Sequence, residues 1–306
     1  YGPSIPRMMG ISKKPIMNEN KKLIPVENYG IKCMSIGFIL DEDAPTIWRG
    51  PMVMKALEQM FNGVEWGELD YLIIDLPPGT GDAQLTLAQN SKLTGSIIIS
   101  TPQEVALADA RKGINMFKKV NVPIVGIVEN MSGYICPSCG ELSQIFGKSG
   151  GEKLASDFNV PLLGQIPLDP IVMTQVDEGS LNYDEDTPHN LKFLTLAETV
   201  ESELKKAQEQ AKEFETDEMS ISGKGLEIAW SDGKKSILDA YNLRLACPCA
   251  SCVDENTGEK ILKEEMVPKT IKILGLRPVG RYGVAINFSD GHNTGIFKFK
   301  RLKEMS

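Results

Sequence analysis

The chain of 306 residues has little of what several classes of protein require. It contains only 2 histidines, too few for a credible Ser/His/Asp catalytic set. No run of about 18 apolar residues occurs, so no membrane-spanning helix is expected. A net charge of -8 leaves no basic excess for binding nucleic-acid phosphates, and the first residues lack the pattern of an export signal. These absences predict a cytoplasmic protein without a membrane or nucleic-acid partner, with an organelle stroma or matrix as an open alternative.

The 6 cysteines are few, and they are grouped along the chain. Cys33 stands alone in an apolar stretch and is interpreted as a core residue. The other five form a pair, Cys136 and Cys139, and a cluster of three further along the chain. Disulfide frameworks have a different, dispersed spacing, so this grouping indicates metal sites in a reducing compartment.

Short apolar runs alternate with helical patterns between residues 31 and 167. The runs are apolar throughout, as in strands covered by helices on both faces, so we predict an α/β fold with a doubly wound, mostly parallel sheet. The expected strands are residues 32–39, 71–75, 96–100, 124–128 and 162–166, and the expected helices are residues 51–61, 83–90, 104–119 and 151–158.

A second domain is expected after a long charged helix at residues 191–215, whose apolar face ends near Leu204. His189, just before that helix, is interpreted as exposed. We predict one domain at residues 1–215, a linker at 216–225 and a small strand-rich domain at 226–306. Asp232-Gly233 and Asp290-Gly291 each suit a hairpin turn, and a domain of this size often gains stability from a metal ion.

Cys136 and Cys139 form a two-thiolate motif that follows the apolar run at residues 124–128. A tetrahedral zinc ion or an iron-sulfur cluster normally takes four ligands. Two copies of the chain, or a second donor, must therefore complete the site, and we predict a homodimer. By spacing alone, a zinc ion bridging two chains is as good a reading as a cluster.

A nucleotide site is predicted at Asp75 and Gly79, because Asp75 ends an apolar strand-like run where α/β sheets bind ligands. Its carboxylate can hold a Mg²⁺-bound water, and Gly79 allows a phosphate to approach the backbone. A simple strand-to-helix turn is the alternative. The phosphate-binding pattern G-x-x-x-x-G-K-[ST] is absent, and Gly147-Lys148-Ser149 is interpreted as an ordinary helix start. The chain opens at Tyr1 in the middle of a pattern, so we expect the phosphate loop to be missing and this piece to bind nucleotide poorly.

Three cysteines within six residues, together with His292 after the second Asp-Gly turn, form the other metal signal. These are Cys247, Cys249 and Cys252. A Cys₃His set is typical of a closed structural zinc site. A second cluster site and unliganded thiols are the alternatives.

Several motifs follow one another along the first two thirds of the chain: Tyr1-Gly2-Pro3-Ser4, Arg49-Gly50-Pro51-Met52, Asp75 to Asp82, Val128-Glu129-Asn130-Met131, Cys136-Pro137-Ser138-Cys139 and Ile166-Pro167-Leu168-Asp169. In these motifs the chain resembles the Mrp/ApbC family of P-loop ATPases. The resemblance implies an ATP-dependent carrier that transfers iron-sulfur clusters to apo-proteins. It also implies a [4Fe-4S] cluster that is bound by Cys136 and Cys139 and shared across a homodimer. For the nucleotide, it implies that Asp75 belongs to the second nucleotide switch and that Asn130 lies near the adenine. Asp169 completes the expected nucleotide contacts.

The last part of the chain contains Trp230-Ser231-Asp232-Gly233, Leu243-Arg244-Leu245-Ala246-Cys247 and Asp290-Gly291-His292-Asn293. In these motifs it resembles the amino-terminal domain of gamma-butyrobetaine hydroxylase, which implies that the three cysteines and His292 bind zinc. Two other functions stay open for the whole chain: a positioning ATPase of the MinD/ParA kind, and a structural zinc-binding adaptor without turnover.

Overall fold

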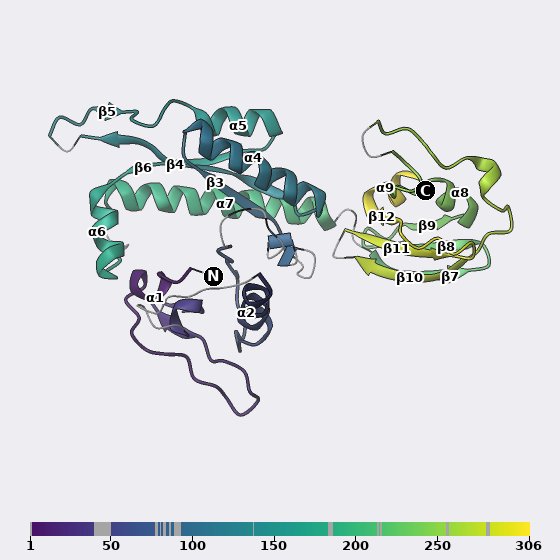
Figure 1. Ribbon diagram of the computed structural model, residues 1–306, viewed down its shortest axis with the longest axis horizontal. Helices are drawn as coiled ribbons and strands as arrows, with labels where there is room; N and C mark the ends of the chain where they lie inside the picture. Colours follow the sequence, from purple (N-terminus) through teal and green to yellow (C-terminus); the bar gives the residue numbers. More distant parts are fainter. Residues whose placement is uncertain are drawn as a thin grey trace. The chain divides into compact units, whose positions relative to one another are not determined.

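The computed structural model describes most of the chain, namely residues 2–39, 50–76, 79, 81, 84–85, 87–88, 93–136, 138–182, 186–212, 214, 216–254, 257–279 and 282–306. The chain divides into two compact units, Tyr1–Leu204 and Lys205–Ser306. In Figure 1 the first unit runs from purple to teal and the second from green to yellow. No helix in the described ranges is long and apolar enough to cross a membrane.

The first unit is built on a parallel sheet. Strand β4 (Ile124–Ile135) lies in the middle, with β3 (Ser96–Ser100) and β6 (Leu162–Leu168) parallel to it on either side. The far end of β4 continues beyond its pairing with β3 and pairs antiparallel with the short β5 (Leu142–Ser143). The predicted strands at 96–100, 124–128 and 162–166 are therefore confirmed, and β4 is seven residues longer than its apolar run.

Helices cover both faces of this sheet, as Figure 1 shows. On one face, α4 (Glu104–Lys119) and α5 (Gly150–Phe158) bury a core that includes Ile114 and Leu154. On the other face, α7 (Pro188–Lys212) packs through Leu196, Val200 and Leu204. The doubly wound α/β class is thus confirmed, and the apolar residues of α7 that pack on the sheet repeat every four positions.

Two expected strands near the start of the first unit are wrong. Residues 71–75 form no strand, and the side chain of Ile73 is 91% exposed, because an apolar run becomes a strand only where another backbone pairs with it. Of residues 32–39, only the first two belong to β2 (Ile31–Cys33), which forms a hairpin with β1 (Val26–Asn28). Ser35 then ends the extended backbone, since its hydroxyl accepts a hydrogen bond from the Gly37 N-H and caps the 3₁₀ helix η1 (Ile36–Phe38).

The first unit contains further helices. Helix α2 (Gly50–Asn62) confirms the expectation at residues 51–61. Of the helix expected at 83–90, residues 84–85 and 87–88 are helical, and the other four lie outside the described residues. Two short helices were not expected from the sequence, α1 (Ile5–Met8) and α6 (Pro170–Glu178). Helix α5 begins directly after Ser149, so the Gly147-Lys148-Ser149 tripeptide is the helix start that the sequence indicated.

The second unit has two antiparallel three-stranded sheets. The first consists of β7 (Thr216–Ser222), β8 (Gly225–Trp230) and β9 (Lys235–Leu238), and the second of β10 (Ile273–Val279), β11 (Gly283–Phe288) and β12 (Ile296–Lys298). Both sheets contribute to one core around Trp230, Phe288 and Phe297. Residues of α8 (Ala240–Leu245) and α9 (Phe299–Glu304) pack into the same core. A 3₁₀ turn, η2 (Glu264–Met266), lies between α8 and β10 in the chain.

Strand β7 overturns the prediction of a linker at residues 216–225. It pairs along its length with β8, but it is an edge strand and most of its side chains are exposed. Edge strands tolerate polar sequences, and for that reason the sequence of β7 resembles that of a solvated linker. Both Asp-Gly turns lie in hairpins, one between β8 and β9 and the other in the loop between β11 and β12, with Gly233 and Gly291 at positive φ.

Candidate functional site

Cys136 and Cys139 lie at the tip of the ribbon that β4 and β5 form. The tip is closed by two backbone hydrogen bonds, from the Cys136 N-H to the Glu141 carbonyl at 3.0 Å and from the Gly140 N-H to the Cys136 carbonyl at 2.8 Å. Gly140 has a φ of +73°, which few other residues adopt without strain. Cys136 is half-buried and Cys139 is exposed, so the ribbon presents two sulfur atoms at the surface of the first unit.

The turn also favours the thiolate form of Cys136. Hydrogen bonds from the backbone N-H groups of Ser138 and Cys139 lower the pKa of Cys136, and the Cys139 side chain adds to the effect. The thiolate is the form that binds iron or zinc. The site therefore has two accessible sulfur atoms and local donors that stabilise the Cys136 thiolate.

Large apolar side chains flank this pair of cysteines on the ribbon. Ile135 is 45% exposed, Leu142 is 55% exposed and Ile145 is 58% exposed. Ile135 and Leu142 are directly opposite each other in the β4–β5 register. The two cysteines thus stand within an exposed apolar surface, which we call the ribbon surface.

The predicted nucleotide residues have different surroundings. Asp75 and Gly79 are both exposed, and a Cβ added at Gly79 would meet no atom within 4 Å. Asp75 does not end a strand as expected; its carboxylate lies instead near the first residues, since a Cβ placed on Gly2 would be 3.5 Å from Asp75 Oδ2. Asn130 turns back on its own backbone, where its Oδ1 accepts a hydrogen bond from the Met131 N-H at 2.9 Å.

Asp169 has a structural role that the sequence did not indicate. It caps α6, because its Oδ1 accepts a hydrogen bond from the Ile171 N-H at 2.8 Å, and its Oδ2 lies 3.4 Å from His189 Nδ1. His189 is only 8% exposed, so its interpretation as an exposed residue is wrong. Its other ring nitrogen, Nε2, lies 3.1 Å from Thr187 Oγ1, so both nitrogens of the buried imidazole have a polar partner.

Glu129 is a buried carboxylate that sequence reasoning missed. It is 1% exposed and is the last residue of β4 that pairs with β3, and its oxygens accept hydrogen bonds from the Gly151 N-H at 2.5 Å and from Gln165 Nε2 at 2.9 Å. An acidic group at a helix N-terminus is favoured by the helix dipole, so Glu129 ties the start of α5 to the sheet. Its signal in the sequence is a charged residue directly after an apolar strand.

The structure brings together all four residues of the predicted Cys₃His set. The sulfur and nitrogen donor atoms of Cys247, Cys249, Cys252 and His292 lie within 4.8 Å of one another. The cysteines follow α8, and His292 lies in the loop between β11 and β12. The three sulfur atoms are 3.1, 3.4 and 3.8 Å from His292 Nε2.

Burial and hydrogen bonds shift the pKa values of three of these donors. Burial raises the pKa of Cys247 to about 12. Burial acts in the same direction on Cys249, but hydrogen bonds from Thr294 and from the other two cysteines outweigh it and lower the pKa of Cys249 to about 7. Burial and the nearby Arg244 lower the pKa of His292, which favours the neutral imidazole that binds metals.

The spacing of the donors fits a single tetrahedral ion. With zinc-sulfur bonds of about 2.3 Å and a zinc-nitrogen bond of about 2.0 Å, neighbouring donors stand roughly 3.5 to 3.8 Å apart. The observed sulfur-nitrogen distances of 3.1 to 3.8 Å bracket this separation. In a [4Fe-4S] cluster each protein ligand binds a different iron atom, so the four ligands must stand farther apart than they do here.

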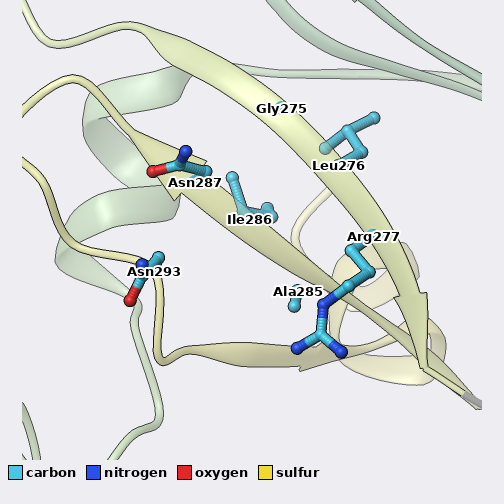
Figure 2. Close-up of a pocket in the computed structure, with 7 residues that line it drawn as sticks. All are labelled: Gly275, Leu276, Arg277, Ala285, Ile286, Asn287 and Asn293. Atoms are coloured by element: carbon cyan, nitrogen blue, oxygen red, sulfur yellow. The ribbon is translucent and has the colours of Figure 1, made fainter.

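Two shallow hollows lie on the surface of the second unit. One, of about 440 Å³, opens on the outer face of β10 and β11, and Figure 2 shows Arg277, Asn287 and Asn293 around it. None of the predicted site residues lines this hollow. The other, of about 520 Å³, is lined in part by Cys247 and by the cations Lys260 and Arg301.

Comparisons with known proteins divide the chain into the same two parts. A model of the family described as NUBPL iron-transfer P-loop NTPase matches residues 1–201. A model described as gamma-butyrobetaine hydroxylase-like, N-terminal, matches residues 218–303.

Curated relatives match the first part of the chain. An iron-sulfur protein required for NADH dehydrogenase from Arabidopsis thaliana is 58% identical over 179 residues, which are 58% of this chain and 57% of that protein. An iron-sulfur cluster carrier protein from Haemophilus influenzae is 47% identical over 207 residues, 67% of this chain and 56% of that protein. The chain thus spans little more than half the length of these relatives.

A solved structure also resembles the first part. It is a nucleotide-binding protein from Archaeoglobus fulgidus in complex with ADP, 38% identical, and the similarity covers 63% of this chain and 74% of that one with a TM-score of 0.53.

Proposed function

The chain belongs to the NUBPL iron-transfer P-loop NTPase family and also contains a gamma-butyrobetaine hydroxylase-like N-terminal domain, and from this premise we propose that it carries an iron-sulfur cluster and delivers it to apo-proteins. The observation that carries the proposal is the exposed pair Cys136 and Cys139 at the tip of the β4–β5 ribbon. Relatives that match this part of the chain are described as iron-sulfur cluster carrier or transfer proteins.

The accessible position of the two sulfur atoms suits transfer better than storage. A recipient protein must bring its own thiolates to the cluster, and ligand exchange needs an approach that a buried site would block. We propose that the cargo is a [4Fe-4S] cluster, whose four cysteine ligands come as two thiolates from each of two chains.

The test of this function is transfer itself. A cluster-loaded sample of the protein, incubated without oxygen with an apo-enzyme that needs a [4Fe-4S] cluster, is expected to restore that enzyme's activity within minutes. A chelator that binds free iron should leave the restoration unchanged if the cluster passes directly between proteins. Restoration that the chelator abolishes would mean that the cluster falls apart into iron and sulfide, and direct delivery would be wrong.

A homodimer through the ribbon surface follows from the same proposal. The exposed Ile135, Leu142 and Ile145 would be covered by the partner around the shared cluster, which would shield them from water. We expect Leu142→Asp to weaken the cluster-loaded dimer about tenfold or more, because a carboxylate would be desolvated at the interface. Sedimentation velocity over a range of concentrations measures this, with Leu274→Asp, an equally exposed leucine of the second unit, as the matched control. Equal dissociation constants for the two variants would contradict the interface.

We further propose that ATP with Mg²⁺ acts on this carrier, with Asp75 and Gly79 near the phosphates and Asn130 and Asp169 near the rest of the nucleotide. The family and the ADP complex of the archaeal structure support this proposal. We expect the entire protein to lose ATP hydrolysis in the variant Asp75→Asn and to retain it in Asp70→Asn. Equal hydrolysis rates in the two variants would show that Asp75 is not part of the nucleotide site.

For the second unit we propose a structural zinc ion on Cys247, Cys249, Cys252 and His292. The donor spacing supports a single ion, and the buried positions of Cys247 and Cys252 leave no room for exchange with a recipient. Holding three cysteine sulfurs in contact costs free energy. The ion would offset this cost, because it would bind the three sulfurs as thiolates. A location in the cytoplasm stays a prediction from composition.

A further inference from the structure

Arg244 is a buried cation beside the Cys₃His set, and nothing in the resemblance assigns it a role. It lies on α8, three residues before Cys247, and is 7% exposed. Its guanidinium makes two directed contacts, from Nε to Asp290 Oδ2 at 2.7 Å and from Nη1 to Cys252 Sγ at 3.3 Å. One side chain therefore touches a carboxylate and a metal-binding sulfur at the same time.

The contacts of Asp290 extend this arrangement to the other segment of the site. Asp290 Oδ1 accepts a hydrogen bond from the His292 N-H at 3.0 Å, while its Oδ2 takes the guanidinium. The cysteines come from the chain after α8 and His292 comes from the β11–β12 loop. The pair of Arg244 and Asp290 is thus a direct link between the two segments that must meet at the metal.

The guanidinium of Arg244 also bears on the charge balance of the metal centre. Three thiolates and a neutral imidazole around a divalent ion carry a net charge of -1, and Asp290 adds another negative charge close by. A buried charge without a partner is costly, and a guanidinium can satisfy two acceptors through its planar fork. Arg244 supplies the positive charge in contact with both anions.

We propose that Arg244 is a positioning residue for the metal centre, which holds Cys252 in its binding geometry and compensates the charge of its thiolate. The proposal rests on the assignment of a divalent ion to the Cys₃His set. Residues that support metal ligands in this way typically change affinity 10-fold to 100-fold when they are replaced.

The experiment compares Arg244→Met with Arg277→Met in the full chain, using Zn²⁺ in competition with a chromogenic chelator. Arg277 is the matched control, because it is exposed on the outer face of β10. We expect Arg244→Met to bind Zn²⁺ at least 10-fold more weakly than wild type and Arg277→Met to bind it within twofold. Wild-type affinity in Arg244→Met would overturn the proposal. If wild type itself held no stoichiometric Zn²⁺, the assignment of the ion would fail first, and this result is separate from the comparison of variants.

A purely structural role for Arg244 is distinguished by two further measurements. Cobalt-loaded Arg244→Met should show its thiolate-to-metal absorption at longer wavelength, because the sulfur that loses a hydrogen bond gives up electrons more easily; packing alone would not move this band. Arg244→Lys keeps the charge and the stem of the side chain but cannot form the fork. Its affinity should lie between wild type and Arg244→Met, and an affinity no better than that of Arg244→Met would contradict charge compensation, even where the methionine variant folds poorly.

Discussion

Replacing Cys136 with alanine is expected to abolish cluster binding by the first unit. After anaerobic reconstitution with iron and sulfide, wild type should show a broad absorbance near about 400 nm, with four iron atoms for each pair of chains, as cysteine-ligated clusters do. The variant should show neither, because one lost thiolate per chain leaves a dimer with only two of its four ligands. Cys139→Ala should behave in the same way, since the two sulfur atoms occupy one turn.

Cys33→Ala is the matched control for both variants. Cys33 is half-buried, and burial raises the pKa of its thiol, so it is held in the form that does not bind iron. We expect the full iron and sulfide content in this variant. Unchanged iron and sulfide in Cys136→Ala and in Cys139→Ala would show that the cluster is held elsewhere and would remove the proposed function together with its site.

The parallel sheet could be predicted because its signal is local. The runs at residues 96–100, 124–128 and 162–166 are rich in apolar residues, and in the structure the first and the last pair in parallel with the middle one. Residues 71–75 carry the same signal and form no strand. The apolar residues of this segment indicate a tendency to be buried. A strand also needs a second backbone segment to pair with, and the sequence of one segment does not specify that partner. The polar edge strand β7 fails in the opposite direction, since it has a partner in β8 without an apolar pattern.

The residues of the sites also differ in whether the sequence alone could identify them. The Cys₃His set could be found from the sequence, because soft-metal ligands are rare residues with restricted spacing. Glu129, His189 and Arg244 could not, because each is buried beside a polar partner that is distant in the sequence. A charged residue inside an apolar motif is the one local hint, and it is present for both Glu129 and Arg244.

Removing the metal is expected to destabilise the second unit far more than the first. Much of the free energy of metal binding adds to folding where the site is not formed in the unfolded chain, and saturation at about 1,000 times the dissociation constant is worth about 4 kcal/mol. For a domain of this size that corresponds to a shift of roughly 15 to 30 °C in Tm. Cys247 and Cys252 lie within the same apolar core as Trp230 and Phe288, so the ion and the core are expected to be lost together.

Scanning calorimetry of the full chain, with and without a strong chelator, measures this effect as the movement of one transition. Cys252→Ser should reproduce the chelated curve without chelator, because it removes one of the four ligands. Ser251→Ala, an exposed neighbour in the same loop, should keep the wild-type curve and its response to chelator. The two treatments should not add, since each removes the same ion. A Cys252→Ser protein that still lost stability on chelation would place the stabilising metal outside the Cys₃His set, and a wild type indifferent to the chelator would leave the four donors as packed, unliganded side chains.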